Sequence, residues 1–330
     1  MTTHIKKVVF STLLTFACVG VALLFPEFVL RMKNASMKNY DIEMWRYAKE
    51  LKTPSENPLL GHEHLKNQQA TLQSVLLRTN EWGLRGGPVS QTPAPRRILA
   101  LGSSITFGWG VKEEETMTSL LENKLKSAGE EVEFLNAGIG NYNSARYVER
   151  FLTRLEDLHP TDILVHYFLR DAETLEAGGG NWFLKNSQVA VTLWMALNQM
   201  KQKTGGLEEH YRKVYEPNAP GRVEMEKALA RLARYAREKK IKLYLAMTPD
   251  VHDLINYPFA SIHEEMKKVA EREGYEYVDL LPALRGIPSS EIWSLPNDPH
   301  PNALGHRKMA EALFPVMHNN PIVNRAISSK

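Results

Sequence analysis

The sequence has little cysteine, no strong excess of charge of either sign, and no phosphate-binding glycine pattern. Cys18 is the one cysteine among 330 residues. An intramolecular disulfide framework and a zinc site built from thiolates are therefore excluded. The net charge is only +3, and no basic stripe alternates with aromatic residues, so nothing indicates a nucleic-acid partner. Nucleotide binding is disfavoured because no Gly-x-Gly-x-x-Gly pattern follows a predicted strand.

The longest apolar run, residues 8–25, lies behind Lys6 and Lys7 near the N-terminus. As a helix, its roughly eighteen residues would be about 27 Å long, close to the thickness of a bilayer's hydrocarbon core. A cleaved signal peptide would have a shorter apolar region ending in a small-x-small site, which this run lacks. Lipid attachment at Cys18 is disfavoured as well, because Thr15 is a poor residue three positions before it. We therefore predict an uncleaved signal anchor.

The charge pattern orients this anchor poorly, because basic residues stand on both sides of the apolar run. The N-terminal tail is short and the rest of the chain is long. We therefore expect a single-pass membrane protein with a cytoplasmic N-terminus and a catalytic domain on the extracytoplasmic, periplasmic side. The membrane is the partner that this helix predicts, and the sequence does not identify a protein partner.

Three segments follow from composition and pattern: the anchor at 1–34, a lead-in and linker at 35–95, and an α/β domain at 96–330. The lead-in is expected to hold a helix at 41–51 and an edge strand at 71–79. Its end is rich in glycine and proline, as linkers are. His62 and His64 would share a face of an extended segment, but no third ligand accompanies them, so no metal site is predicted.

From residue 96 onward, apolar strands alternate with amphipathic helices. Strands are predicted at 97–102, 132–136, 163–168, 242–247 and 277–280. Helices are predicted at 116–127, 144–158, 222–239, 261–273 and 303–314. This alternation predicts one parallel sheet of about five strands with helices on both faces. A segment at about 173–221, with a helix near 189–200, interrupts the rhythm and is expected to be an insertion that serves as a lid or a partner surface.

A glycine turn follows the first of these strands. Gly102 ends the apolar run, and Ser103 and Ser104 stand at its tip. A serine just past the end of a central parallel strand lies where open α/β sheets place their ligands. A serine after a glycine is also a common turn residue. The nucleophile hypothesis therefore requires a partner base elsewhere in the chain.

A candidate base stands near the other end of the chain. His300 precedes Asn302, a good N-cap for the helix that follows, so the histidine lies in a short turn. Asp298, two residues earlier, is close enough to orient the imidazole. A carboxylate on one ring nitrogen fixes the tautomer and leaves the other nitrogen to take a proton from a serine hydroxyl. The alternative is a capping turn with a surface histidine.

Together, the two ends resemble the SGNH, or GDSL-like, hydrolase family in its membrane-anchored bacterial form. Residues 102–111 match the block that carries the nucleophile, and residues 300–306 match the last block and its helix. Residues 136–143 and 168–171 fall where two intermediate blocks supply oxyanion donors. The resemblance covers roughly residues 96–314 and implies a flavodoxin-like, three-layer α/β/α sandwich.

The resemblance also implies roles for single residues. The implied catalytic residues are Ser104, Asp298 and His300. The implied oxyanion or substrate-binding residues are Gly140, Asn141 and Arg170.

Four positions depart from the family pattern. Ser103 replaces the usual Asp before the nucleophile, and Asn141 stands where the oxyanion Gly aligns. Arg170 replaces the usual Asn donor, and its charged fork would either stabilise an oxyanion or grip an anionic substrate. Asp298 precedes His300 by two residues rather than three.

The function that the resemblance implies is a serine esterase that needs no metal and no cofactor. Its expected substrate is an acylated small molecule or polysaccharide, with acetyl groups of an envelope or exported polysaccharide as the specific hypothesis. Two alternatives stay open: an O-acyltransferase with the same triad, and a non-catalytic glycan-binding or assembly protein. An α/β-hydrolase is disfavoured because Thr106 takes the place of the second glycine in Gly-x-Ser-x-Gly.

Overall fold

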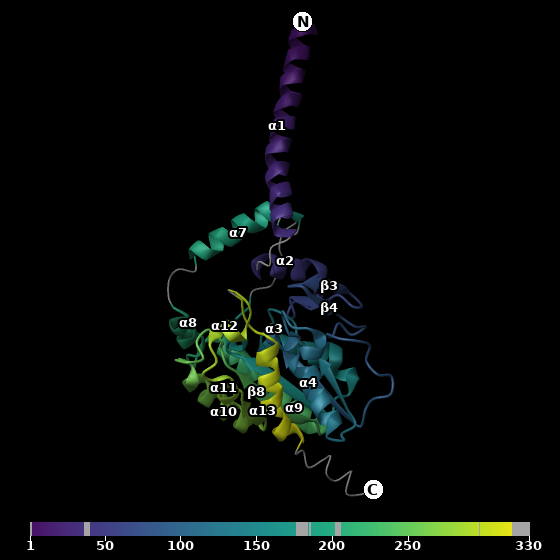
Figure 1. Cartoon of the computed structure of the whole chain (residues 1–330), viewed down its shortest axis with the longest axis vertical. Helices are drawn as coiled ribbons and strands as arrows, with labels where there is room; N and C mark the ends of the chain where they lie inside the picture. The colour runs from purple at the N-terminus through teal and green to yellow at the C-terminus, as the bar shows by residue number, and fades with distance from the viewer. Residues whose placement is uncertain are drawn as a thin grey trace. The chain divides into compact units, whose positions relative to one another are not determined.

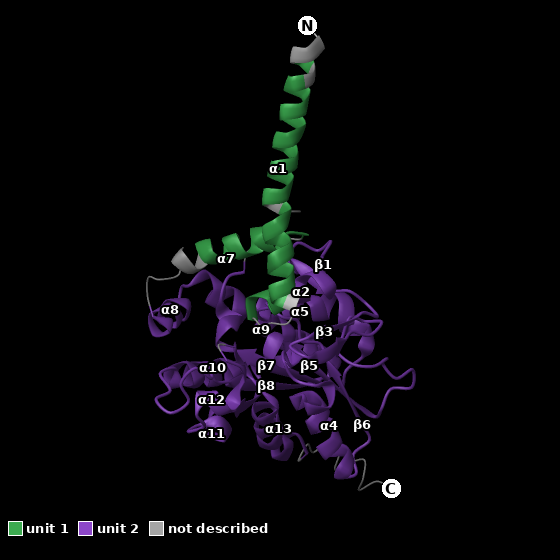
Figure 2. Ribbon diagram, turned by 45° about the horizontal axis from the view of Figure 1, so that its top comes forward, with its two compact units in different colours: residues 1–45, 179–205 green, residues 46–178, 206–330 purple. Residues whose placement is uncertain are grey.

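The computed structural model describes residues 2–35, 40–175, 184, 186–201, 206–296 and 298–318. Two compact units divide the chain: residues 1–45 with 179–205, and residues 46–178 with 206–330 (Figure 2). Within the insertion predicted at 173–221, residues 176–183, 185 and 202–205 lie outside the described residues.

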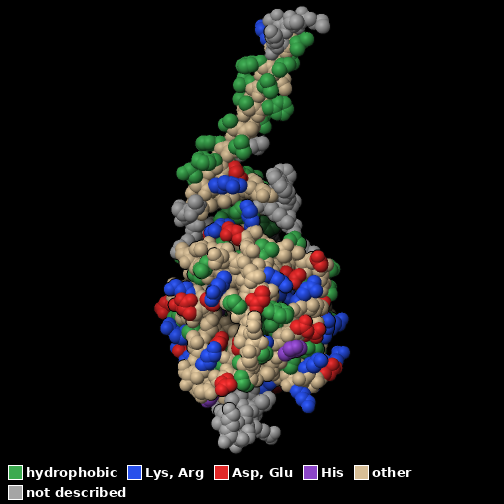
Figure 3. Space-filling model, turned by 90° about the vertical axis from the view of Figure 1, so that its right-hand side faces the viewer, with side chains coloured by type: hydrophobic (Ala, Val, Ile, Leu, Met, Phe, Trp, Pro, Cys, Tyr) green, Lys and Arg blue, Asp and Glu red, His purple; other side chains and the backbone are tan. Residues whose placement is uncertain are grey.

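The first unit contains α1 (Thr2–Ala35) and α7 (Gln188–Lys201). Lys7–Asn34 of α1 is long and apolar enough to cross a membrane, and its exposed side chains are mainly hydrophobic (Figure 3). The carboxylate of Glu27 accepts hydrogen bonds from the backbone N–H groups of Gln188 and Val189, at 3.0 and 3.1 Å. An acidic group at a helix N-terminus satisfies amide donors that the helix itself leaves unpaired. Glu27 thus joins the two helices within this unit.

The second unit is built on a five-stranded sheet (Figure 1). Its strands are β5 (Arg96–Gly102), β6 (Val132–Asn136), β7 (Asp162–Phe168), β8 (Lys242–Thr248) and β9 (Glu276–Asp279). All four neighbouring pairs are parallel, in the order β6-β5-β7-β8-β9. This order reverses beside β5, which is the flavodoxin-like arrangement that directs ligands to the carboxyl end of that strand. The predicted fold class and all five predicted strands are confirmed.

Successive residues of the strands face two separate cores, as the pleat of a strand requires. Leu99 and Leu101 of β5 belong to one core, and Ile98 and Ala100 belong to the other. The first core is covered by α5 (Ser144–Arg150), α9 (Pro220–Lys239) and α10 (Ala260–Glu273). The second is covered by α4 (Met117–Ser127), α11 (Leu281–Leu284) and α13 (Ala303–His318). These are the three layers of the predicted sandwich.

The helix predicted at 144–158 is shorter than expected. Its α-helical part ends at Arg150, and the chain continues through a π-helical turn, Phe151–Leu155, and a 3-10 turn, Glu156–Leu158. The remaining short elements are α3 (Ser104–Phe107), α8 (Leu207–Val214), α12 (Ser289–Ile292), β10 (Trp293–Leu295), β11 (Asp298–Pro301), and 3-10 turns at Glu113–Glu115 and Leu169–Ala172.

The lead-in contains α2 (Tyr40–Glu50) and two small antiparallel sheets. One pairs β1 (Lys52–Pro54) with β2 (His62–His64), and the other pairs β3 (Gln69–Leu72) with β4 (Val75–Arg78). The predicted edge strand at 71–79 is therefore wrong, because the chain reverses at Gln73 and Ser74. Both residues have positive φ values, 50° and 62°, which is the backbone of a tight hairpin turn. Neither residue is a glycine, so the usual sequence signal of that turn is missing.

Candidate active site

The nucleophile candidate lies at the carboxyl end of β5. Ser104 is the first residue of α3, directly after the turn at Gly102 and Ser103. A Cβ atom on Gly102 would lie 2.0 Å from Thr106 Oγ1 and 2.8 Å from the carbonyl oxygen of His166. Only glycine therefore allows this close approach. Because Ser104 begins the helix, α3 offers no carbonyl partner to its N–H, which leaves that group available to a ligand.

Ser104, His300 and Asp298 form one hydrogen-bonded chain. Ser104 Oγ lies 2.8 Å from His300 Nε2, and His300 Nδ1 lies 2.6 Å from Asp298 Oδ1. An ionised carboxylate can only accept hydrogen bonds, so Nδ1 carries the ring proton and Nε2 accepts from the serine hydroxyl. The structure therefore brings together the three residues that the sequence assigns to catalysis.

The two-residue spacing of Asp298 and His300 has a structural reason. Both residues lie on β11, an extended strand that pairs with β10. Side chains two apart in a strand point to the same face. The same Oδ1 atom also accepts the backbone N–H of His300, at 3.2 Å. The departure from the family spacing thus leaves the aspartate-histidine contact intact.

Asp298 is fully buried and accepts two further hydrogen bonds that the sequence did not predict. Gln73 Nε2 and Trp109 Nε1 donate to its Oδ2 atom, at 2.6 and 3.1 Å. Burial alone would raise the pKa of Asp298, but the hydrogen bond and charge of His300 and the hydrogen bond of Gln73 lower it below its usual value. Asp298 is therefore ionised at neutral pH.

A second loop, residues 137–142, lies beside the nucleophile turn. The N–H of Ile139 donates to the carbonyl oxygen of Gly102, at 3.2 Å. Asn141 is exposed, with φ at +65°, a left-handed conformation that glycine favours and asparagine tolerates. This explains how asparagine can replace glycine at this position. The N–H of Gly140 donates to the hydroxyl of Tyr47, at 2.9 Å, so the next amide along, that of Asn141, is the oxyanion candidate.

Arg170 lies in the 3-10 turn that follows β7. Its side chain is half exposed, and its Nε atom lies 3.2 Å from a carboxylate oxygen of Glu173. Glu173 also binds His210 Nε2, at 2.8 Å. The arginine that the sequence predicts to stabilise an oxyanion or to bind an anionic substrate is therefore held by an acidic neighbour.

Arg85, which the sequence analysis did not single out, supports the nucleophile turn from the lead-in. Its buried guanidinium donates to the carbonyl oxygens of Phe107, Gly108 and Val111. Burial lowers the pKa of Arg85 to about 10, so the group is charged at neutral pH. A fixed cation on three carbonyl groups holds the chain that leaves α3.

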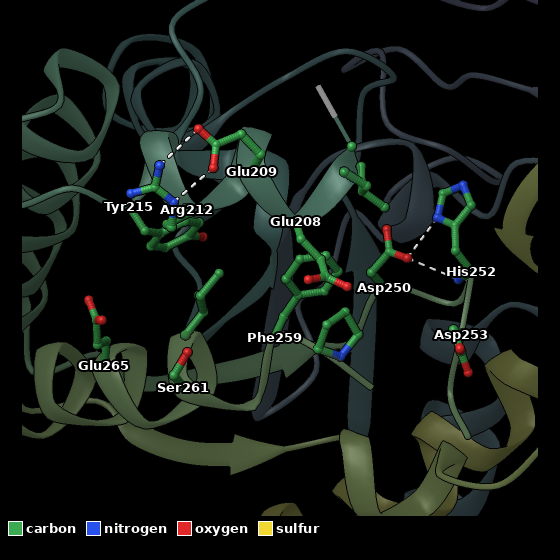
Figure 4. A pocket seen from close by; sticks show the side chains of 14 residues that line it. Glu208, Glu209, Arg212, Tyr215, Asp250, His252, Asp253, Phe259, Ser261 and Glu265 are labelled. Carbon is green, nitrogen blue, oxygen red and sulfur yellow. Dashed lines mark hydrogen bonds and ion pairs between the residues drawn. The ribbon is translucent and has the colours of Figure 1, made fainter. Parts of the chain in front are cut away.

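A cavity of about 730 Å³ opens at the carboxyl end of β8 (Figure 4). Its lining includes Glu208, Arg212, Asp250, His252 and Phe259. In the close-up, Asp250 points toward His252, whose Nδ1 atom lies 2.7 Å from Asp250 Oδ1. This pair repeats the Asp-x-His arrangement of Asp298 and His300, but the cavity lining contains none of Ser104, Asp298 and His300.

The histidines considered as metal ligands have other partners. His62 Nε2 lies 3.0 Å from the carbonyl oxygen of Gly140, and His64 Nε2 lies 2.6 Å from the hydroxyl of Tyr47. Across the described part of the chain, no group of three or more His, Cys, Asp or Glu side chains is arranged to hold a metal ion.

A family model, the GDSL-like lipase/acylhydrolase family, matches residues 100–308, more than half of the chain. The protein belongs to this family of SGNH hydrolases. The match begins within β5 and ends within α13, so it includes all three residues of the hydrogen-bonded chain. The family resemblance seen in the sequence is confirmed.

Solved structures with similarity to this chain include two acetylxylan esterases. A catalytic mutant of Axe2 from Geobacillus stearothermophilus is 16% identical, with a TM-score of 0.45, over 68% of this chain and 95% of that one. The acetyl xylan esterase AlAXEase is 17% identical, with a TM-score of 0.42, over 67% and 98%. TesA is 15% identical, with a TM-score of 0.41, over 67% and 98%. No curated protein matches the chain. The family assignment rests on the family model and not on these structures.

Proposed function

We propose that this SGNH-family protein is a serine esterase that hydrolyses O-acyl groups through Ser104, His300 and Asp298. The observation that carries the proposal is the continuous hydrogen-bonded chain from Ser104 Oγ through His300 to Asp298. The serine is partly exposed, while the carboxylate at the other end is fully buried. This is the arrangement that serine acyl transfer requires: a reachable nucleophile, a base and a fixed group that orients the base.

In the first half of the reaction, Ser104 Oγ attacks the ester carbonyl carbon while His300 Nε2 takes the hydroxyl proton. The resulting imidazolium is stabilised by the ionised Asp298. The N–H groups of Ser104 and Asn141 are the proposed donors to the oxyanion. When the C–O bond of the ester breaks, His300 returns the proton to the departing alcohol.

In the second half, water attacks the acyl-serine. His300 takes a proton from the water as its oxygen bonds to the acyl carbon, and the Ser104–acyl bond then breaks. His300 gives the proton back to Ser104 Oγ. The products are one carboxylic acid and one alcohol, and no metal or cofactor takes part.

The natural substrate that we propose is an O-acylated, and specifically O-acetylated, polysaccharide outside the cytoplasm. The support is the apolar helix α1, which is long enough to anchor the chain in a membrane. A tethered esterase would be close to polymers that are present at or exported through that membrane. Carbonate extraction of membranes and protease treatment test this. We expect the chain to stay with the membrane in carbonate, and a protease added on the periplasmic side to cleave the catalytic domain. Release of the chain by carbonate would contradict the anchor.

The direct test uses the detergent-solubilised full chain and 4-nitrophenyl acetate. Wild type is expected to release nitrophenol, and Ser104→Ala to lose this activity. Ester hydrolysis that survives in Ser104→Ala would remove Ser104 from its role. Assays with an acetylated polysaccharide then separate hydrolysis, which yields acetate, from transfer of acetyl groups to a second sugar.

A further inference from the structure

One residue of the loop 137–142, called here the oxyanion loop, is held through both its carbonyl and its N–H by the lead-in. The carbonyl oxygen of Gly140 accepts from Lys52 Nζ at 2.6 Å and from His62 Nε2 at 3.0 Å. The N–H of Gly140 donates to the hydroxyl of Tyr47 at 2.9 Å. Three side chains from residues 47–62 therefore converge on a single residue 78 or more positions later in the chain.

The hydroxyl of Tyr47 is itself fixed in direction. His64 Nδ1 lies 3.0 Å from the carbonyl oxygen of Gly83, which can only accept, so Nδ1 carries the proton. His64 Nε2 then accepts the O–H of Tyr47, at 2.6 Å. Tyr47 in turn accepts the N–H of Gly140. Every donor in this buried chain has one acceptor, which fixes the Ile139–Gly140 peptide, while Lys52 and His62 hold the Gly140–Asn141 peptide through its carbonyl oxygen.

The carbonyl of Gly140 and the N–H of Asn141 belong to the same peptide group. A side chain that donates to the carbonyl oxygen withdraws electron density through the amide and makes its N–H a stronger donor. Burial, together with the charge of Arg146, lowers the pKa of Lys52 to about 7, so the ammonium and the neutral amine, both of which can donate to the carbonyl, are present at neutral pH. Lys52 Nζ also lies 4.2 Å from the centre of the Tyr47 ring, an attractive position for an ammonium group. The lysine is thus fixed on the carbonyl of the amide whose N–H is the oxyanion candidate.

We propose that Lys52 is a positioning residue that orients and polarises the Gly140–Asn141 peptide, so that the Asn141 N–H stabilises the developing oxyanion. Lys52 acts through the backbone and does not touch the substrate. The inference rests on the proposed esterase function, because it assigns Asn141 to the oxyanion hole. It adds a contribution to catalysis from the lead-in, outside the segment that the family model matches.

The test compares steady-state kinetics of Lys52→Met with wild type, using 4-nitrophenyl acetate. A direct oxyanion donor contributes on the order of 10²–10³ in kcat, and a residue that only polarises such a donor contributes less. We expect kcat to fall about tenfold while KM stays within about twofold. Lys66, an exposed lysine of the same lead-in, supplies the matched control, and Lys66→Met should equal wild type.

Rescue separates polarisation from simple loss of folding. Lys52→Cys treated with 2-bromoethylamine regains an amino group at nearly the position of the lysine Nζ. We expect its kcat to recover to within about threefold of the wild-type value. Wild type treated in the same way controls for alkylation of Cys18. Failure of the alkylated variant to recover while the protein stays folded would contradict the proposal.

The outcomes also separate this inference from the proposed function. If wild type hydrolyses the ester, Ser104→Ala does not, and Lys52→Met matches wild type, the Lys52 role alone is wrong. If wild type is inactive, or Ser104→Ala is as active as wild type, the esterase proposal fails and the Lys52 role fails with it.

Discussion

The second unit contains two regions with different tasks: the core at 96–178 and 206–318, and the part of the lead-in at 46–85. Every residue proposed to react lies in the core. The lead-in instead contacts the groups that hold the reacting residues: Gln73 binds Asp298, Arg85 binds the carbonyls after α3, and Lys52 binds Gly140. In the proposed mechanism, the reacting groups and the residues that support them therefore come from distant parts of the sequence. Changes to Ser104 or His300 should abolish activity, and changes to these lead-in residues should weaken it.

The largest effect is expected from the triad. Ser104→Ala and His300→Ala should each lower kcat by roughly 10⁴ or more, as in other hydrogen-bonded triads. His252→Ala is the matched control, because His252 has the same Asp-x-His contact but lies outside the triad. Ester hydrolysis by the three variants checks this. Equal losses in His300→Ala and His252→Ala would break the assignment of the base.

Acid should destabilise the core strongly. His166 and His306 are buried, and burial lowers the pKa of each to about 3, from a usual value of 6.5. Below pH 6.5 the unfolded chain binds protons that the folded chain does not, so stability is lost as pH falls toward 3. The free energy of unfolding should fall by about 1.4 kcal/mol per pH unit for each histidine.

Urea unfolding at pH 7, 6 and 5 measures this dependence. His306 Nδ1 accepts the N–H of Met117, at 3.0 Å, and in His306→Gln the amide oxygen can replace that acceptor. The pH slope of this variant should be smaller than that of wild type by the share of one histidine, about 1.4 kcal/mol per pH unit. A stability that stays constant between pH 6.5 and 5 would contradict the assignment of both groups as neutral.

In the lead-in, Gln73→Ala should lower kcat about tenfold with little change in KM. Losing one donor to a buried carboxylate costs about 1–3 kcal/mol, and Asp298 retains the contacts of His300 and Trp109. Gln69→Ala, an exposed change on the same hairpin, is the control. If Gln73→Ala keeps the wild-type kcat, support from the lead-in does not extend to Asp298.

The smallest effect is expected at Arg170. Its side chain is half exposed and forms an ion pair with Glu173. A solvent-exposed guanidinium that already binds a carboxylate is better suited to contact the substrate than to act as a fixed oxyanion donor. Arg170→Ala should raise KM about threefold to tenfold and leave kcat within about twofold. A fall in kcat of about 100-fold would instead assign Arg170 to the oxyanion hole.

The sequence predicted the sheet well because buried parallel strands are continuous apolar runs bounded by turn residues. It also predicted Ser104, Asp298 and His300 as a group, since they stand in short blocks that the family shares. In the lead-in, the hairpin at Gln73 and Ser74 was missed, because neither residue is the glycine that normally marks such a turn.

The support of the site could not be predicted for a different reason. Gln73 and Asp298 are 225 positions apart, and Lys52 and Gly140 are 88 positions apart. No local pattern links residues at such separations. A lysine bound to a carbonyl oxygen looks like any other lysine in the sequence. Only the folded chain shows that the lead-in contacts the nucleophile turn, the oxyanion loop and the triad aspartate.

The most direct test of this account is covalent labelling of the folded full chain with a fluorophosphonate, followed by peptide mapping. Such probes react with a serine that a neighbouring base has activated. We predict one labelled residue, Ser104, with no label in Ser104→Ala and a rate at least 100-fold lower in His300→Ala. A folded wild-type protein that carries no label, or a label at another serine, would contradict the central claim that Ser104 is the activated nucleophile.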